Sequence, residues 1–185
     1  MFRTYGATDV RILNGTLQKW IREDRPVETG PFKDIDDTSE SGYDYEFSKT
    51  TYDSLQTILN KAYDLYRQKG QHNHLQIIDV RDPLSYRAGT IVGAMNDPYA
   101  SYLNPEKTRF LSKEELQKMF KTNGIDISKS LSFSWGAGVS AAISEVAAKI
   151  AGAPQTSVFD GSFQEYSTKG KPDFSDPEWE SKYKF

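Results

Sequence analysis

Residues 131–147 decide the fold, and they read Leu131-Ser132-Phe133-Ser134, then Trp135-Gly136-Ala137-Gly138-Val139-Ser140-Ala141, then Ala142-Ile143-Ser144-Glu145-Val146-Ala147. This pattern predicts a short strand, a seven-residue loop and a helix. Two glycines let consecutive backbone N–H groups turn inward, and the positive N-terminal end of the helix points at the same place. Loops of this kind usually hold a thiolate or an oxyanion. Here Trp135 faces the loop, and the chain contains no cysteine.

The composition predicts one globular domain with an appendage. The chain has 185 residues, of which 37% are hydrophobic and 13% aromatic, which is enough for one core. A net charge of -3 without a cluster of basic residues predicts no nucleic-acid-binding face. No apolar run is long enough to span a membrane. The absence of cysteine excludes disulfides and thiol catalysis, and the sequence predicts no cofactor and no metal site.

Helices and strands are expected to alternate along the chain. The predicted elements are a helix over 50–68, a strand over 75–80, a helix opened by a capping box at Ser112, a strand over 131–134, a helix ending near Gly152, and a strand over 156–159. Such alternation predicts an α/β fold with a parallel sheet covered by helices on both faces. Ligands of these sheets bind beyond the carboxyl ends of the strands, where the Trp135 loop falls.

A stretch near the N-terminus recurs 146 positions later. The matching pairs are Gly6/Gly152, Ile12/Val158, Leu13/Phe159, Asn14/Asp160, Gly15/Gly161, Thr16/Ser162, Leu17/Phe163, Gln18/Gln164, Trp20/Tyr166 and Pro26/Pro172. Ungapped agreement over about twenty residues indicates duplication. Both copies predict a short strand, a tight turn and a helical turn. The second copy ends a complete domain, whereas the first stands alone, so we interpret residues 1–30 as a domain remnant.

Several segments together resemble the rhodanese domain, specifically the catalytic C-terminal domain of two-domain thiosulfate and mercaptopyruvate sulfurtransferases. The segments are Ile78-Asp79-Val80-Arg81, Arg87 to Ala94, Ser112 to Leu116, the loop Trp135 to Ala141, and Asp160-Gly161-Ser162-Phe163-Gln164-Glu165-Tyr166. The resemblance implies a rhodanese-like domain over 50–170, preceded by a remnant of a second rhodanese-like domain over 1–30. An acidic linker over 31–49 and an aromatic tail over 171–185 complete the expected organisation.

Departures from the family pattern decide the expected chemistry. Trp135 stands at the position of the family's sulfur-carrying cysteine, Thr90 at its histidine and Val92 at its proline. A persulfide carrier needs a stabilised thiolate, so we predict no catalytic residue and an indole that is largely buried in the old pocket. The remaining candidate site is a degenerate anion cradle, Gly136, Ala137, Gly138, Val139 and Ser140. Asp79, Arg81 and Arg87 are substrate-side remnants or, alternatively, members of surface ion pairs near Asp79 and Asp82.

The unpaired repeat and the aromatic tail predict protein partners within a larger complex. The expected partner contacts are Leu17, Trp20, Trp179, Tyr183 and Phe185, although the tail is equally explained as a strap across its own domain. The predicted function is a catalytically inactive rhodanese-like structural or accessory subunit. The alternatives are one half of a split two-domain thiosulfate sulfurtransferase, or an anion-binding sensor. Family resemblance favours a mitochondrial location, with the cytoplasm as the alternative.

Overall fold

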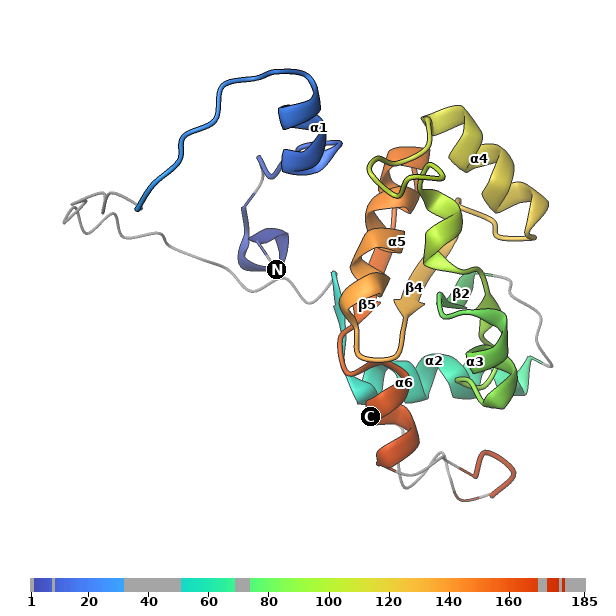
Figure 1. Ribbon diagram of the computed structural model, residues 1–185. Helices are drawn as coiled ribbons and strands as arrows, with labels where there is room; N and C mark the ends of the chain where they lie inside the picture. Colours follow the sequence, from blue (N-terminus) through green and yellow to red (C-terminus); the bar gives the residue numbers. More distant parts are fainter. Residues whose placement is uncertain are drawn as a thin grey trace.

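The computed structural model describes residues 2–7, 9–31, 51–68, 74–169, 173–176 and 178. Within them lies a parallel five-stranded sheet in the order β1-β5-β4-β2-β3 (Figure 1). The strands are β1 (Tyr52–Asp53), β2 (Leu75–Asp79), β3 (Met95–Asn96), β4 (Ser130–Ser134) and β5 (Thr156–Phe159). The α/β class and the parallel sheet expected from the sequence are confirmed.

Helices cover both faces of the sheet. The helices are α1 (Thr16–Arg22), α2 (Leu55–Arg67), α3 (Pro83–Ala88), α4 (Lys113–Thr122), α5 (Val139–Ala151) and α6 (Ser162–Thr168), with 3₁₀ turns at Phe2–Tyr5 and Tyr99–Tyr102. Side chains alternate along β2, so that Ile78 joins a core with α4 and α5, whereas Ile77 joins a second core with α2 and α6. Two buried cores therefore hold the carboxyl ends of β2, β4 and β5 in place.

Three local expectations are corrected. The sequence pattern predicted a helix from residue 50, but the chain first forms β1, and α2 begins at Leu55 after Ser54 accepts a hydrogen bond from the Thr57 N–H at 3.2 Å. The edge strand β3 was missed, because two-residue strands are too short to show a periodic pattern. The loop after β4 spans four residues rather than seven, since α5 begins at Val139.

Other local expectations are confirmed. Ser112 and Glu115 form the predicted capping box at the start of α4. Helix α5 ends at Ala151, and Gly152 adopts the left-handed conformation that terminates it. Within the described residues, no helix is long and apolar enough to cross a membrane.

A buried polar network ties the edge strand β1 to the rest of the sheet. Asp53 is buried, and Lys61 Nζ lies 2.9 Å from both of its carboxylate oxygens. The same ammonium group donates to Ser132 Oγ at 2.6 Å, and the Ser157 hydroxyl donates to Asp53 Oδ2 at 2.5 Å. Each charged group is thereby paired and hydrogen-bonded, which offsets the cost of taking it out of water.

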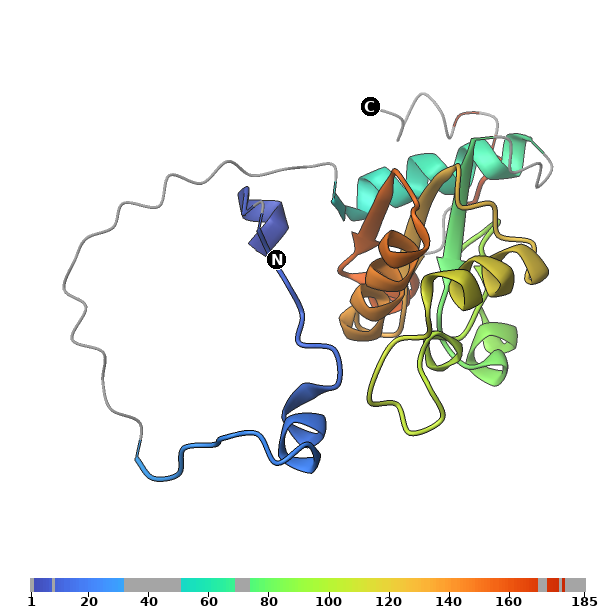
Figure 2. The same cartoon turned by 90° about the horizontal axis from the view of Figure 1, so that it is seen from above.

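The N-terminal arm, defined here as residues 2–31, lies apart from the sheet on the side of α5 (Figures 1 and 2). Hydrogen bonds join it to the domain at both ends: Thr4 to Thr51 through their hydroxyls at 3.0 Å, and the Phe110 N–H to Asn14 Oδ1 at 3.3 Å. Helix α1 contains no buried residue. The short strand expected in the first copy of the repeat is absent from the described arm, because no neighbouring strand lies beside it to complete a hydrogen-bond ladder.

The C-terminal tail begins by packing on its own domain. Phe174 is buried, and its ring lies 5.7 Å from the Tyr63 ring and 5.8 Å from the Tyr66 ring, both on α2. This contact favours the strap interpretation for the start of the tail. Trp179, Tyr183 and Phe185, three of the expected partner contacts, lie outside the described residues, as does nearly all of the acidic linker over 31–49.

Candidate functional site

The loop Trp135–Gly138 connects β4 to α5 at the carboxyl edge of the sheet, where it was expected. Gly138 has a φ of 86°, and a Cβ atom there would overlap the carbonyl oxygen of Asp160. Only glycine satisfies both the left-handed backbone and this close approach. The loop conformation therefore depends on the residue that follows β5.

The first turn of α6 holds the loop in place. The Trp135 N–H donates to Ser162 Oγ at 3.0 Å, and the Ser162 hydroxyl donates to the Phe159 carbonyl at 2.7 Å. In return, the Phe163 N–H donates to the Trp135 carbonyl at 2.9 Å and the Gln164 N–H to the Gly136 carbonyl at 3.0 Å. Sequence analysis assigned no role to Ser162 and Phe163, although the repeat and the family signature both include them.

The candidate anion donors are the backbone N–H groups in and just after the loop. Among the described residues, the backbone N–H groups of residues 136–140 have no hydrogen-bond acceptor. They lie at the N-terminal end of α5, where the helix dipole favours negative charge. Val139 is exposed at the mouth of the loop, and Ser140 is buried behind it. The candidate cradle therefore consists of backbone N–H groups and does not depend on a nucleophilic side chain.

Trp135 is partly buried. Its side chain packs against the core cluster that contains Val80, Tyr102 and Phe133. The expectation of a largely buried indole is therefore met only in part, because the residue is intermediate in exposure rather than buried. An indole is neither a nucleophile nor an anion, so this position supplies no group that can carry sulfur.

The candidate anion ligand Arg81 is already paired. Asp79 is 1% exposed, and its Oδ2 accepts hydrogen bonds from Arg81 Nη2 at 2.6 Å and from the Thr90 hydroxyl at 2.7 Å. Arg81 Nη2 also donates to the Gly89 carbonyl at 2.5 Å, and the guanidinium lies 4.0 Å from the centroid of the Phe163 ring. The ion-pair interpretation holds for Arg81, but the pair is buried rather than on the surface.

Arg87 does not form the ion pair that was the alternative expectation for it. It is exposed on α3, and within the described part of the chain it forms no hydrogen bond or ion pair. Its expected partner Asp82 instead caps α3, accepting from the Leu84 N–H at 2.9 Å and from the Ser85 hydroxyl at 2.6 Å. Hydrogen bonds from Ser85 lower the pKa of Asp82. Arg81 is thus buried and paired, whereas Arg87 is exposed and forms no ion pair within the described chain.

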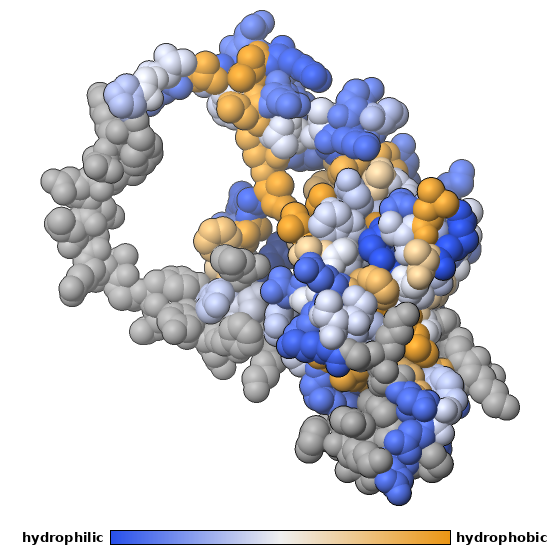
Figure 3. Space-filling model, turned by 60° about the horizontal axis from the view of Figure 1, so that its bottom comes forward, coloured by the Kyte–Doolittle hydropathy of each residue, from blue (hydrophilic) through white to orange (hydrophobic). Residues whose placement is uncertain are grey.

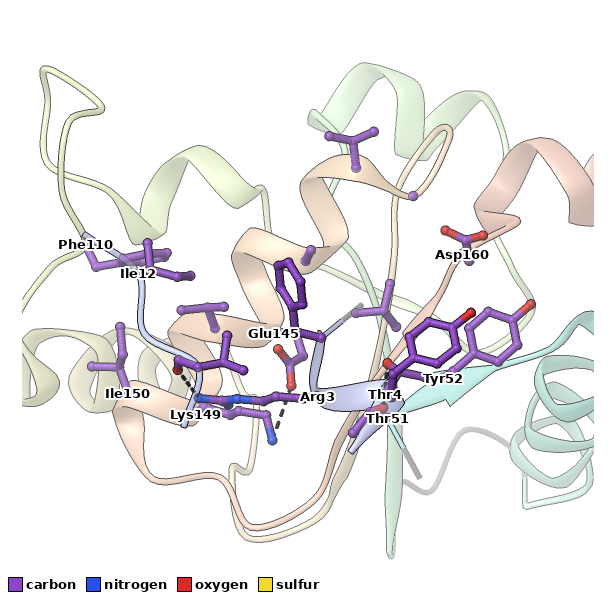
Figure 4. A pocket seen from close by; sticks show the side chains of 18 of the residues that line it. Arg3, Thr4, Ile12, Thr51, Tyr52, Phe110, Glu145, Lys149, Ile150 and Asp160 are labelled. Carbon is purple, nitrogen blue, oxygen red and sulfur yellow. Dashed lines mark hydrogen bonds and ion pairs between the residues drawn. The ribbon is translucent and has the colours of Figure 1, made fainter. Parts of the chain in front are cut away.

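A cavity of about 1020 Å³ adjoins the loop, between the arm and the outer face of α5 (Figure 4). Its apolar lining includes Phe2, Ile12, Phe110, Val139, Val146 and Ile150. Glu145 and Lys149 form an ion pair along its α5 wall, with Nζ 3.3 Å from Oε1. The described residues contain no group of three or more metal-ligating side chains. The lining is therefore mainly apolar, with the Glu145–Lys149 pair as a polar element along one wall.

A buried acid lies just after β3, next to the C-terminal end of α4. Asp97 is 1% exposed and accepts hydrogen bonds from the Tyr102 hydroxyl at 2.9 Å and from Asn123 Nδ2 at 3.0 Å. Burial raises the pKa of Asp97 to about 6 despite these two bonds, and burial also raises the pKa of Tyr102 well above its ordinary value. Sequence analysis gave no signal for this pair, because its burial depends on the packing of α4.

The fold and the loop define a rhodanese-like domain. The chain belongs to the rhodanese-like domain family, whose model matches residues 61–169. The thiosulfate sulfurtransferase of Gallus gallus is 28% identical over 176 residues, which cover 94% of this chain and 59% of that protein. The 3-mercaptopyruvate sulfurtransferase of Homo sapiens is 27% identical over 175 residues, covering 94% of this chain and 58% of that protein.

A solved structure agrees with these relatives. SseA from Escherichia coli, a 3-mercaptopyruvate sulfotransferase, superposes with a TM-score of 0.71 at 26% identity, covering 88% of this chain and 60% of that chain. This chain thus spans about three fifths of the length of these relatives. It has sulfurtransferase homologues but no cysteine, which is consistent with a lack of cysteine-based sulfur transfer.

Proposed function

We propose that this chain is a catalytically inactive rhodanese-like protein that acts as a structural or accessory subunit of a larger assembly. The observation that carries the proposal is a complete rhodanese-like loop in a chain without cysteine. By its place in the loop motif, Trp135 stands where the family's cysteine stands. The loop is held by α6 and ends at Gly138, whose positive φ suits glycine, so the loop is formed although no cysteine can act in it.

The surroundings of the loop support inactivity. A sulfur donor such as thiosulfate is an anion that needs cationic ligands. Arg81 is committed to Asp79 and Gly89, and Thr90 donates to the same carboxylate, so this cluster is satisfied internally. Restoring a thiol would leave these partners unchanged.

The arm supports the accessory role. Four of its large apolar side chains, Ile12, Leu13, Leu17 and Ile21, are more than half exposed. Clustered apolar exposure of this kind is typical of surfaces that a partner covers. We propose that residues 1–30 correspond to the last strand–helix unit of a second rhodanese-like domain, and that the assembly is mitochondrial rather than cytoplasmic, which fractionation of the source cells tests directly.

An activity assay tests the first half of the proposal. Homogeneous protein is incubated with thiosulfate or 3-mercaptopyruvate and cyanide, and thiocyanate is measured, with the Gallus gallus thiosulfate sulfurtransferase as positive control. We expect no turnover above background, and no robust activity from Trp135→Cys, because Thr90 and Val92 remain in place. Turnover by the unmodified protein would contradict the proposal, and strong rescue by the single change would mean that the substrate site is intact.

Assembly size tests the second half. The tagged native protein is isolated gently from source cells, and its mass is compared with that of the Leu17→Ala/Trp20→Ala variant. We expect the native protein in a complex and the variant released as a folded domain. A native protein that elutes as a monomer, or a double variant that co-purifies with its partners unchanged, would contradict the accessory role.

Anion binding is the second candidate function. The free N–H groups of residues 136–140 favour it, because they sit at a helix N-terminus beside a fluorescent indole. Titration with sulfite or phosphate, followed by the fluorescence of Trp135 in a Trp20→Phe/Trp179→Phe background, tests it. A saturable change at submillimolar anion would favour a sensor over a purely structural subunit.

A further inference from the structure

We propose that Ser175 is a phosphorylation site for an acid-directed serine kinase, and that its phosphate releases Phe174 from its contact with α2. The site concerns the start of the tail rather than the arm, so it does not depend on the accessory role. Residues 173–176, drawn in red, lie on the side of the domain away from the arm (Figures 1 and 2). The arm carries many of the exposed apolar side chains that Figure 3 shows in orange, and none of those takes part in the site.

Phe174 is the side chain that fixes the start of the tail to the domain. It is 6% exposed, whereas the next residue, Ser175, is exposed. Its ring packs against the rings of Tyr63 and Tyr66 on α2, and it belongs to the same buried core as Tyr166 of α6. Aromatic pairs of this kind add to the stabilisation that burial of the ring provides. The start of the tail thus covers a part of the core to which α2 and α6 both contribute.

A turn closed by one carboxylate presents Phe174 to this core. Asp173 Oδ1 accepts hydrogen bonds from the Ser175 N–H at 3.0 Å and from the Ser175 hydroxyl at 2.5 Å. The Asp176 N–H donates to the Asp173 carbonyl at 3.1 Å. The hydrogen bonds from Ser175 lower the pKa of Asp173, which keeps this carboxylate charged at neutral pH. The hydroxyl of an exposed serine is therefore one of the donors that close the turn.

The same turn occurs a second time in opposite electrostatic surroundings. The N–H and the hydroxyl of Ser128 donate to Asp126 Oδ1 at 3.0 Å and 2.6 Å, and Ser128 is also exposed. Lys129 follows this serine and forms an ion pair with Asp126 at 3.6 Å. After Ser175, by contrast, the first and third residues are acidic. The hydrogen bonds of the two turns are alike, so the charge of the following residues is what distinguishes the two serines.

The residues after Ser175 suit a kinase whose substrate cleft is basic. Asp176 and Glu178 stand one and three positions after the serine, where their carboxylates would pair with cationic side chains of the enzyme. The same cleft would reject Ser128, because Lys129 would meet those cations. An acid-directed kinase therefore discriminates between two serines that have the same local hydrogen bonds.

Phosphorylation opposes the turn that holds Phe174. In the transfer, the bond from the γ-phosphorus of ATP to its bridging oxygen breaks, and a bond from that phosphorus to Ser175 Oγ forms. ADP leaves with the electron pair of the broken bond, and the hydroxyl proton passes to the base of the kinase. The product has no hydroxyl proton to donate to Asp173, and its charge of about -2 stands beside this carboxylate and that of Asp176. Phe174 then loses the turn that places its ring against α2.

Release of Phe174 is expected to reach the loop after β4 through α6. Phe174 shares a buried core with Tyr166, and the N–H groups of Phe163 and Gln164 on the same helix hold two carbonyls of the loop. Helix α6 is only seven residues long, so its stability comes mainly from packing. Amide hydrogen exchange in α6 should therefore be faster when the tail is phosphorylated.

The first experiment locates the phosphate. The native chain, Ser175→Ala and Ser128→Ala are incubated with a purified acid-directed serine kinase and Mg-ATP, and incorporation is measured by mass spectrometry. We expect Ser175→Ala to lower incorporation roughly tenfold or more, and Ser128→Ala to change it less than about twofold. Protein isolated from the source cells with phosphatase inhibitors should carry phosphate on Ser175. Incorporation that survives Ser175→Ala, or isolated protein without phosphate on Ser175, would overturn the site.

The second experiment follows the release of Phe174. Hydrogen–deuterium exchange is compared between the native chain and Phe174→Ala, each with and without phosphate. We expect exchange in residues 162–168 to be roughly threefold faster or more in the phosphorylated native chain and in unmodified Phe174→Ala. Phosphorylation of Phe174→Ala should add little, because the ring is already gone. Helix α4, which packs in the other core, is the internal control.

Unchanged exchange in α6 after phosphorylation, or equal acceleration in both Phe174→Ala and the native chain on phosphorylation, would overturn the release of Phe174. Urea unfolding checks that Phe174→Ala keeps a folded domain, and Phe174→Leu replaces it in the comparison if it does not. A native protein that proves monomeric would contradict the accessory role and leave these results unaffected.

Discussion

The two copies of the repeat are the same local structure in two environments. Residues 156–168 supply an interior strand and a core-facing helix, whereas residues 10–22 supply a helix of the same length that buries nothing. The turn and the helix form in both places because their geometry is local. The strand forms only in the second, since a strand needs neighbours to accept and donate its backbone hydrogen bonds. Leu13 is exposed and the matching Phe159 is buried because only the second copy has neighbouring strands.

The second copy of the repeat also forms hydrogen bonds that hold the loop Trp135–Gly138, whereas the first copy holds no such loop. The N–H groups of Phe163 and Gln164 hold the carbonyls of Trp135 and Gly136, and Phe163 stacks on Arg81. In the arm, Trp20 makes its contacts with nearby residues of the arm itself. Its Nε1–H donates a hydrogen bond to the Pro26 carbonyl at 2.9 Å, and the Arg25 guanidinium lies over its ring. One copy is thus part of the domain's cooperative unit, while the other is self-contained.

The largest expected contrast is between Phe159→Ala and Leu13→Ala. Removing the fully buried Phe159 ring leaves a cavity in the core and is expected to cost about 3–5 kcal/mol of the free energy of unfolding. Removing the exposed Leu13 side chain is expected to change it by less than about 0.5 kcal/mol. Urea unfolding followed by circular dichroism measures both. Similar losses for the two variants would mean that the arm is folded into the domain.

A smaller effect is expected where the loop meets the second copy. Gly138→Ala is expected to cost about 2–4 kcal/mol, because alanine is strained at a φ of 86° and its methyl group would overlap the Asp160 carbonyl. Gly136→Ala is the matched control, since a Cβ atom there meets nothing within 4 Å, and it should cost less than about 0.5 kcal/mol. Equal thermal stability of the two variants would contradict the close approach.

The pH dependence of unfolding should come from the domain. The pKa of Asp97 is about 6 in the folded protein and 3.8 ordinarily, so the unfolded chain releases its proton first as the pH rises. The contribution of Asp97 is therefore complete below about pH 4 and is lost as the pH rises through 6, by up to about 3 kcal/mol. Asp97→Asn should remove this slope in urea unfolding measured from about pH 4 to 7.5.

A carboxylate in the arm provides the control for the pH dependence of the free energy of unfolding. Hydrogen bonding and charge from Arg25 lower the pKa of Glu23, but Glu23 is exposed on α1's C-terminal side. Glu23→Gln should leave the dependence of stability on pH unchanged. If Glu23→Gln flattens the curve as much as Asp97→Asn does, the acid assigned to the core is the wrong one.

The smallest expected effect concerns the proposed contact residues. Leu17→Ala/Trp20→Ala is expected to shift the free energy of unfolding of the isolated chain by less than about 0.5 kcal/mol, because neither side chain reaches the core. Differential scanning calorimetry on the isolated chain measures this. A clear drop in the melting temperature would mean that loss of partners by this variant reflects unfolding rather than a lost interface.

The sequence alone determined the features that depend on neighbouring residues. The capping box at Ser112, the end of α5 at Gly152, the interior strands β2, β4 and β5, and the repeat could all be read from local pattern. The motifs indicate the family, and the absence of cysteine by itself excludes thiol chemistry. These features are short-range because turns, caps and alternation are set by residues a few positions apart.

Only the tertiary structure decided the rest. The two-residue strands β1 and β3 exist because the sheet offers them a neighbour, and the Asp79–Arg81–Thr90 cluster closes because α3 brings Thr90 back to the strand. The structure also decided that residues 10–13 are not a strand while residues 156–159 are. Nearly equivalent sequences differ there because hydrogen-bond ladders and buried cores are supplied by segments far away in the chain, which local sequence does not encode.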